Sequence, residues 1–170
     1  MDFLSRRTIR KYKNIPVEKE VMNKIMEVAL VSPSACNRRP YEYVVVTDKE
    51  KLAALSMAKA SGASMIENAP LAIVVTGDSN ISDIWTEDCS IAATLIQLKA
   101  WELGLGSCWV QMKNRKDADG NLSEEIIRGI FGIPSHYGVL AVIALGYPDE
   151  EKKGYTADDM NFSKIHYEKF

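Results

Sequence analysis

Cysteine and histidine, the residues that most often build metal centres and nucleophilic sites, are scarce in this chain of 170 residues. Its three cysteines, Cys36, Cys89 and Cys108, show neither metal-ligand nor Cys-x-x-Cys spacing, so we interpret them as reduced thiols of a cytoplasmic protein. The two histidines, His136 and His166, have no serine or cysteine nucleophile motif nearby. The sequence therefore argues against a hydrolase built on a metal or a catalytic triad.

Long apolar runs and a broad excess of positive charge are also missing. No segment reaches membrane-spanning length, and the basic N-terminus is not followed by the apolar run of a signal peptide. The formal net charge of −2 argues against general nucleic-acid binding, which needs a broad basic surface. We see no repeat or linker, so we expect one domain, residues 1–170, with a sizeable core and neither a nucleic acid nor a membrane as partner.

Apolar periodicity, capping residues and β-branched runs predict four helices and four strands. The helices are expected at residues 17–31, 48–60, 84–103 and 121–131, and the strands at residues 43–47, 71–76, 107–111 and 139–145. Residues 84–103 are apolar on nearly every side, which indicates either a central core helix or a subunit interface. Residues 165–170 could pair as an edge strand. The alternation of elements alone suggests α/β units with a parallel sheet.

The most informative stretch is residues 6–12, which place three arginines, a lysine and a threonine in a slightly acidic chain. If this stretch is extended, Arg6, Thr8 and Arg10 face the same way. Guanidinium groups suit bidentate recognition of phosphate, and a threonine hydroxyl adds a short hydrogen bond. Two interpretations remain open from this segment alone: a cup for the phosphate of a small molecule, and a solvated basic arm.

A second segment, residues 32–41, favours the phosphate cup. Its sequence, SPSACNRRPY, has two prolines, two serines and an asparagine, which predict a rigid, non-helical loop. Together with residues 6–12 it closely resembles the nitroreductase family of FMN-dependent flavoproteins. Further matching pieces are Asp88 at the start of an Ala-rich helix and residues 104–109, 132–134 and 145–148. The resemblance runs from about residue 3 to about residue 148, and the tail at 162–170 is similar to that of a short bacterial subgroup.

The resemblance implies an α+β fold with a mixed, mostly antiparallel central sheet flanked by helices. It also implies a homodimer in which the C-terminal segment is exchanged with the partner subunit. We follow it over a parallel sheet, because the tail and the apolar helix fit an obligate dimer better than a monomeric Rossmann fold. Gly104-Leu105-Gly106 is no dinucleotide fingerprint, since it lacks a third glycine and lies between a helix and a strand.

The family pattern implies three groups of FMN-binding residues. The phosphate, ribityl chain and pyrimidine edge would be held by Arg6, Arg7, Thr8 and Arg10. The loop that reaches the flavin from the other subunit would contribute Pro33, Ser34, Ala35 and Asn37. Trp109, Val110, Gln111 and Met112 would lie at the isoalloxazine ring, where a backbone N–H just after the strand meets flavin N5.

Arg39 is also placed near the flavin, at a position where the family usually has glutamine. An extra cation there would favour anionic reduced flavin, bind an anionic substrate, or do nothing. Lys152 and Lys164 are candidate phosphate contacts from the tail. Asn68 matches a position near the flavin in relatives, and it equally fits a turn residue that starts a strand.

The implied reaction is the reduction of a nitroaromatic, a quinone or a related small acceptor by NAD(P)H. Hydride would pass through flavin N5 in a ping-pong cycle, with the cofactor carrying the chemistry. No side chain stands out as a general acid or base, which agrees with hydride transfer. Two alternatives remain: a protein that stores or senses FMN without useful turnover, and a specialised relative such as a dehalogenase or desaturase.

Overall fold

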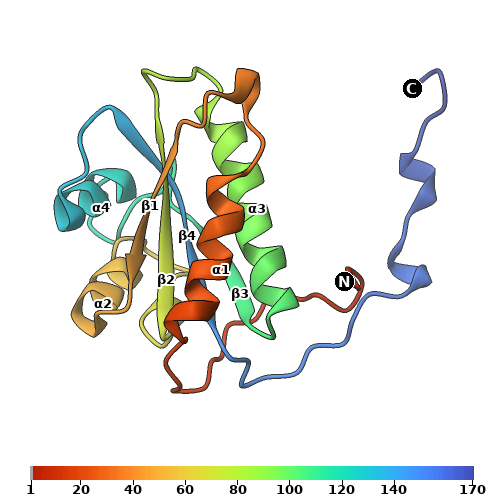
Figure 1. Ribbon diagram of the computed structural model, residues 1–170, viewed down its shortest axis with the longest axis horizontal. Coiled ribbons are helices and arrows are strands. Elements are labelled where there is room, and N and C mark those ends of the chain that lie inside the picture. The colour runs from red at the N-terminus through yellow and green to blue at the C-terminus, as the bar shows by residue number, and fades with distance from the viewer. Residues whose placement is uncertain (1) are drawn as a thin grey trace.

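Four antiparallel strands form the centre of the molecule (Figure 1). The computed structural model describes residues 2–170. The strands are β1 (Tyr41–Val46), β2 (Leu71–Asp78), β3 (Gly106–Gln111) and β4 (Tyr137–Gly146), in the order β1-β2-β4-β3. Every residue of β2 is buried, as the continuous apolar run of this segment predicts. The antiparallel sheet confirms the fold implied by the resemblance and shows that the parallel sheet suggested by pattern alone is wrong.

Two helices cover each face of this sheet (Figure 1). α1 (Lys19–Leu30) and α3 (Trp85–Glu102) pack on one face, and α2 (Lys49–Met57) and α4 (Ser123–Phe131) pack on the other. Asp48 caps α2 as expected, with its side chain accepting a hydrogen bond from the Lys51 N–H at 3.0 Å.

The start of α4 lacks the capping box that the types and spacing of Asn121 and Glu124 would favour. Leu122 occupies the N-cap position and provides no side-chain cap. The Glu124 carboxylate instead accepts hydrogen bonds from Val139 N–H at 3.1 Å and from Asn114 N–H at 3.3 Å. It therefore joins α4 to β4 and to the loop after β3.

α3 is not buried on every side, so the expectation of a central core helix is wrong. Ile91 is 42% exposed, and Leu95, Leu98 and Trp101 are only half-buried. Ile91, Leu95 and Leu98 are spaced by four and three residues and therefore share one face of the helix. We call this face the α3 stripe. Because it is partly exposed, a subunit interface is the remaining interpretation of the apolar helix.

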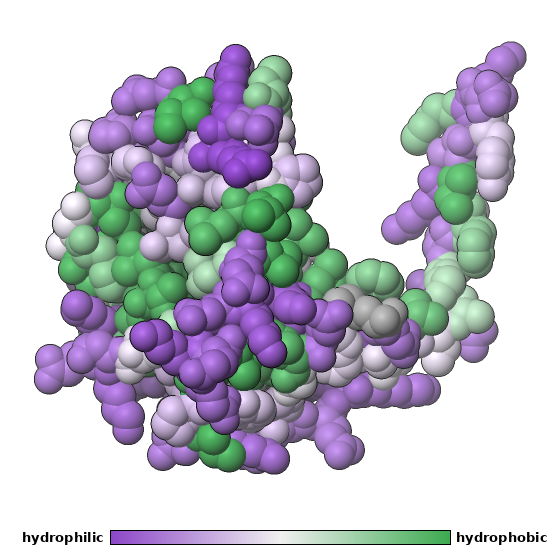
Figure 2. Space-filling view, viewed as in Figure 1, coloured by the Kyte–Doolittle hydropathy of each residue, from purple (hydrophilic) through white to green (hydrophobic). Residues whose placement is uncertain are grey.

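The C-terminal tail extends away from the body of the molecule (Figure 1). It contains two short 3-10 turns, Ala157–Asp159 and Phe162–Lys164. Residues 165–170 pair with no strand of residues 2–170, so the expected edge strand is absent. Figure 2 shows an open hollow between the body and the tail, with apolar surface on the α1 and α3 layer beside it. The tail carries exposed apolar side chains of its own, including Phe162, Ile165 and Tyr167.

Candidate functional site

The basic segment at residues 6–12 lies beside the first residues of β3. Thr8 forms a parallel bridge with Ser107, and the Ile9 N–H donates to the Ser107 carbonyl oxygen at 3.0 Å. Tyr12 forms an antiparallel bridge with Pro148 just after β4. Gly106 permits this arrangement, because a Cβ atom at that position would lie 2.6 Å from the Cβ of Ile9. The segment is therefore a fixed part of the sheet edge and not a loose arm.

Side chains alternate along this segment. Ser5, Arg7 and Ile9 line one cavity of about 260 Å³ together with Trp101 and Pro148. In an extended chain the residues between them, at positions 6, 8 and 10, point to the other side. This agrees with the grouping of the phosphate-binding candidates Arg6, Thr8 and Arg10.

Arg7 makes its contacts with the C-terminal tail. Its guanidinium donates a hydrogen bond to the Lys153 carbonyl oxygen and lies 4.6 Å from the centre of the Tyr155 ring. The Tyr155 N–H in turn donates to the Leu4 carbonyl oxygen at 2.7 Å. These contacts make Arg7 an anchor for the tail, while its contact with a cofactor stays a prediction.

Arg10 shares its surroundings with Lys59, a cation that no sequence pattern indicated. Burial raises the pKa of the Cys108 thiol, and the nearby charges of Arg10 and Lys59 both lower it. Both charges therefore act on Cys108 of β3. Lys59 reaches this place because the chain after α2 turns back toward the loop after β3, where the Ala60 N–H donates to the Lys116 carbonyl oxygen at 2.9 Å.

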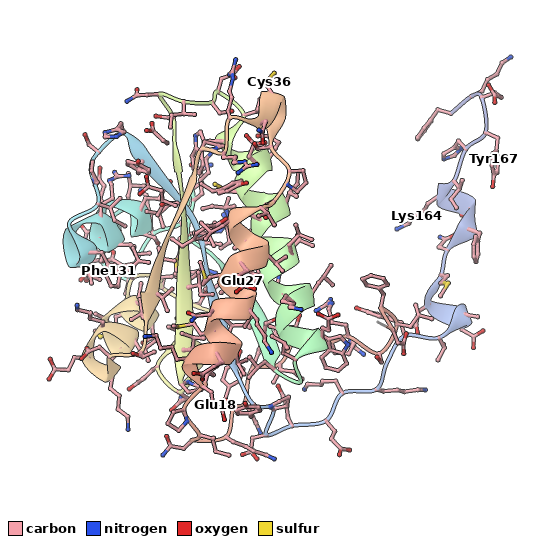
Figure 3. The ribbon with its side chains drawn as sticks, in the orientation of Figure 1. Glu18, Glu27, Cys36, Phe131, Lys164 and Tyr167 are labelled. Atoms are coloured by element: carbon pink, nitrogen blue, oxygen red, sulfur yellow. The ribbon has the colours of Figure 1, made fainter. Side chains whose placement is uncertain are left out.

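Glu150 fixes the backbone of the basic segment. One of its carboxylate oxygens accepts hydrogen bonds from the Arg10 N–H at 2.6 Å and the Lys11 N–H at 3.2 Å. The Lys152 ammonium lies 2.8 Å from the other oxygen. Lys152 first, and the backbone donors after it, lower the pKa of Glu150 to about 2. Lys152, a candidate phosphate contact, is thus paired with Glu150, and Lys164 lies on the extended tail (Figure 3).

The loop at residues 32–39 is held by α3. The Asp88 carboxylate accepts hydrogen bonds from the Ala35 N–H at 2.8 Å and the Ser82 hydroxyl at 3.3 Å. Asp88 is only 2% exposed, so a buried acidic side chain fixes the position of the loop relative to α3. Pro33 is exposed, and the Ser34 hydroxyl accepts a hydrogen bond from the Arg39 N–H at 2.9 Å.

The remaining candidates lie on β3. The Trp109 indole N–H donates to the Gln111 side-chain oxygen at 3.0 Å, and the Gln111 amide donates to the Lys113 carbonyl oxygen at 3.3 Å. Val110 is 1% exposed and belongs to the core. The Lys113 ammonium donates to the Thr86 hydroxyl at 2.7 Å, which joins the end of β3 to the first turn of α3.

Comparison with known proteins gives one consistent result. The model of the nitroreductase family matches residues 4–65 and 54–147. An FMN-dependent nitroreductase from Clostridium difficile has a solved structure with a TM-score of 0.96, 48% identity, and coverage of 99% of this chain and 98% of that one. This chain belongs to the nitroreductase family.

Two curated relatives support the same assignment. A protein of Archaeoglobus fulgidus, provisionally named an NADH dehydrogenase/NAD(P)H nitroreductase, is 39% identical over 98% of this chain and 95% of its own length. An NADH dehydrogenase of Thermus thermophilus is 29% identical over 95% of this chain and 91% of its own length. The nitroreductase family and the oxidoreductase class that the sequence predicted are confirmed.

In this nitroreductase-family chain the two main groups of candidates lie far apart. α3 has 18 residues and therefore spans about 27 Å. Asp88, in its first turn, holds the loop at 32–39, whereas the start of β3 follows its last turn and carries the basic segment at Ser107. Figure 3 shows Cys36 and Glu18 beyond opposite ends of α1, and Glu18 accepts a hydrogen bond from Tyr147 next to the basic segment. A single chain does not bring the loop to the basic segment.

The donors around the basic segment fit the phosphate-bearing flavin of the family resemblance. Arg6, Arg10 and Lys59 supply positive charge, Thr8 supplies a hydroxyl, and pairing with Ser107 fixes the segment against β3. Asn68, the other candidate, lines a separate cavity of about 500 Å³ with Tyr12 and Thr47.

Residues 2–170 lack two further kinds of functional feature. In this part of the chain no three His, Cys, Asp or Glu side chains are grouped so that they could ligate a metal ion. None of the described helices combines the length and the apolar character required to cross a bilayer.

Proposed function

We propose that this protein is an FMN-dependent NAD(P)H oxidoreductase that reduces nitroaromatics, quinones or related small acceptors. The observation that carries the proposal is the fixed cationic segment beside β3, with Arg10 and Lys59 next to the same strand. The names of the relatives, which include an FMN-dependent nitroreductase, support both the cofactor and the electron donor.

FMN would be held by the three groups of residues predicted from the sequence, with Lys59 added to the phosphate and pyrimidine end. Arg6, Thr8 and Arg10 would bind the phosphate and ribityl chain, and Trp109, Val110 and Gln111 would form the strand beside the ring. When bound, FMN supplies the capacity to accept a hydride from NAD(P)H and to pass electron pairs to the acceptor. The chain supplies anchoring charge and orientation, and the oxidised donor leaves before the acceptor binds.

The protein would act as a homodimer with two sites at the interface. The α3 stripe is partly exposed in a single chain, and the loop that carries Pro33, Ser34, Ala35 and Asn37 lies at the opposite end of α3 from the basic segment. A second copy placed against the α3 stripe, within the hollow beside the tail, would bring its loop to the flavin of the first. Exchange of the tail and the cytoplasmic location remain predictions.

The first experiment is the absorption spectrum of the purified protein, followed by mass spectrometry of the released chromophore. We expect an oxidised flavin spectrum and the mass of FMN. Steady-state oxidation of NADH and NADPH with a quinone and with a nitroarene then tests turnover. Parallel lines in double-reciprocal plots support the ping-pong order, whereas bound FMN that neither nicotinamide reduces under anaerobic conditions would favour a storage or sensing protein.

Charge reversal of the phosphate cup tests the assignment of the site. One charge-assisted contact is worth roughly 1.5–3 kcal/mol, so Arg6→Glu should lower FMN affinity at least about tenfold. Lys24→Glu, at an exposed position on α1, makes the same charge change away from the segment and serves as the control. Full flavin occupancy in the Arg6→Glu protein would contradict the assignment.

A further inference from the structure

The loop between α1 and β1 holds an unusual backbone conformation around Arg39. The φ angles of Cys36, Asn37 and Arg39 are 49°, 54° and 50°. Residues other than glycine rarely adopt this left-handed region, and such strain persists only where the surroundings fix it. Three such residues within four positions indicate that the loop is held in one shape.

Hydrogen bonds from both sides of the loop fix this shape. The Arg39 N–H donates to the Ser34 hydroxyl at 2.9 Å, and the Asn37 N–H donates to the Ser34 carbonyl oxygen at 3.0 Å. The buried Asp88 carboxylate holds the Ala35 N–H at 2.8 Å. The position of Arg39 is therefore set by the core of the molecule and not by solvent.

The side chain of Arg39 is also oriented by its own loop. Its Nε–H donates to the Asn37 side-chain oxygen at 2.9 Å. Its two terminal nitrogens make no hydrogen bond or ion pair with residues 2–170, and the residue is exposed. The neighbouring Arg38 differs, because it lies 3.8 Å from Asp83, which is 90% exposed. Arg39 thus presents a cation whose Nε–H is held by Asn37, while its two terminal nitrogens bond to no described residue.

We propose that Arg39 is a specificity-determining residue that binds the anionic group, a carboxylate or a phosphate, of a small-molecule substrate at the partner subunit's flavin. A guanidinium fork matches both anions in a bidentate geometry. The cofactor phosphate would be bound by the basic segment, which lies at the other end of α3, a helix about 27 Å long, in the same chain. The inference rests on the proposed function, because the loop meets a flavin only in the dimer.

The test compares Arg39→Gln with Arg38→Gln in the flavin-loaded dimer. Both substitutions remove one positive charge from the same loop, and only Arg39 has its Nε–H bound to Asn37. In the acceptor arm, kcat/KM is measured for 4-nitrobenzoate, which is anionic, and for 4-nitrobenzyl alcohol, which is neutral. In the donor arm, kcat/KM is measured for NADH and for 1-benzyl-1,4-dihydronicotinamide, which has no phosphate. The two arms distinguish a carboxylate on the acceptor from a phosphate on the donor.

An exposed ion pair changes affinity by a few-fold, so we expect Arg39→Gln to lower the anionic-to-neutral ratio of kcat/KM about three- to fivefold in at least one arm. Arg38→Gln should leave both ratios within about 1.5-fold of the original protein. Equal ratios in Arg39→Gln and the original protein, in both arms, would overturn the inference, as would equal changes in the two variants. Failure of the proposed function is separate, because it would remove flavin or turnover with the neutral substrates in the original protein as well.

Discussion

Substitution of Gly106 by alanine should weaken cofactor binding without touching a predicted cofactor contact. A Cβ atom at this position would lie 2.6, 2.7 and 2.8 Å from the Cβ, Cγ1 and Cγ2 atoms of Ile9. Ile9 is 3% exposed, and its N–H is bound to the Ser107 carbonyl oxygen, so a change of its rotamer alone cannot relieve a contact with its Cβ. The basic segment must move away from β3.

The size of the effect follows from the cost of overpacking. Inserting a methyl group into a filled site costs about 1–3 kcal/mol. If the segment relieves this strain by detaching, FMN affinity should fall about five- to 150-fold, since 1.4 kcal/mol corresponds to tenfold. Binding is measured by quenching of flavin fluorescence during titration of the apoprotein, and stability is measured by urea unfolding of the same samples.

A matched glycine controls for the substitution itself. Gly129, within α4, has no neighbouring atom within 4 Å of the place that a Cβ atom would occupy, so Gly129→Ala should keep FMN affinity and raise stability by up to about 1 kcal/mol. Unchanged affinity and unchanged stability in the Gly106→Ala protein would refute the close packing of Ile9 on β3. Reduced stability with unchanged FMN affinity would instead show that FMN binding does not depend on the position of the basic segment.

Three further changes test other parts of the site. Ile91→Glu should convert the dimer to monomers, as measured by sedimentation. Leu122→Glu, at a side chain with the same 42% exposure, should leave the dimer intact. If the Ile91→Glu protein stays dimeric, the α3 stripe is not the interface. Asp88→Ala should destabilise the protein by about 1–3 kcal/mol in urea unfolding, because the Ala35 N–H loses its hydrogen-bond acceptor. Asp88→Asn keeps an acceptor and should destabilise the protein less. Equal losses of stability in the two variants would contradict the role of Asp88 as the acceptor for Ala35. The folded-state pKa of Glu150 is lowered from 4.5 to about 2, so its contribution to stability is present above about pH 4.5 and is lost as the pH falls toward 2. Glu150→Gln should therefore make stability less dependent on pH in this range. An unchanged pH profile of stability in the variant would contradict this role of Glu150.

The elements of the fold were largely predictable because their signals are local. Asp48 caps α2 with its own side chain, and Gly132 ends α4 in the left-handed conformation that glycine adopts at little cost. The apolar run at 71–76 is a buried strand, as expected. Strand direction was not local information, and only the resemblance to the nitroreductase family predicted the antiparallel sheet correctly.

Tertiary contacts explain what the sequence could not indicate about the candidate site. The charge of Lys59 acts on Cys108 because the chain after α2, at Ala60, pairs with Lys116, which lies beyond two further strands and a helix in the sequence. Arg7 occurs in the same cluster as Arg6 and Arg10, yet its guanidinium binds a tail carbonyl 146 residues away. Patterns within a short stretch of sequence cannot indicate either of these long-range contacts. The alternation of side chains at residues 5–9, in contrast, is a local property, and it was predicted.

The two ends of α3 carry two of the predicted groups of cofactor-binding residues. Its first turn fixes the strained loop through Asp88, and its last turn leads into the strand that holds the basic segment, so the helix that positions both groups also keeps them apart. The same helix exposes Ile91 between its two ends, where a second copy could pack. If two such helices packed antiparallel about a two-fold axis, the loop of each chain would come next to the basic segment of the other, because the first turn of one helix would lie beside the last turn of its partner. On this reasoning, formation of the interface and completion of the cofactor site are one event, and a substitution in the α3 stripe should lower FMN occupancy even though it contacts no predicted cofactor ligand.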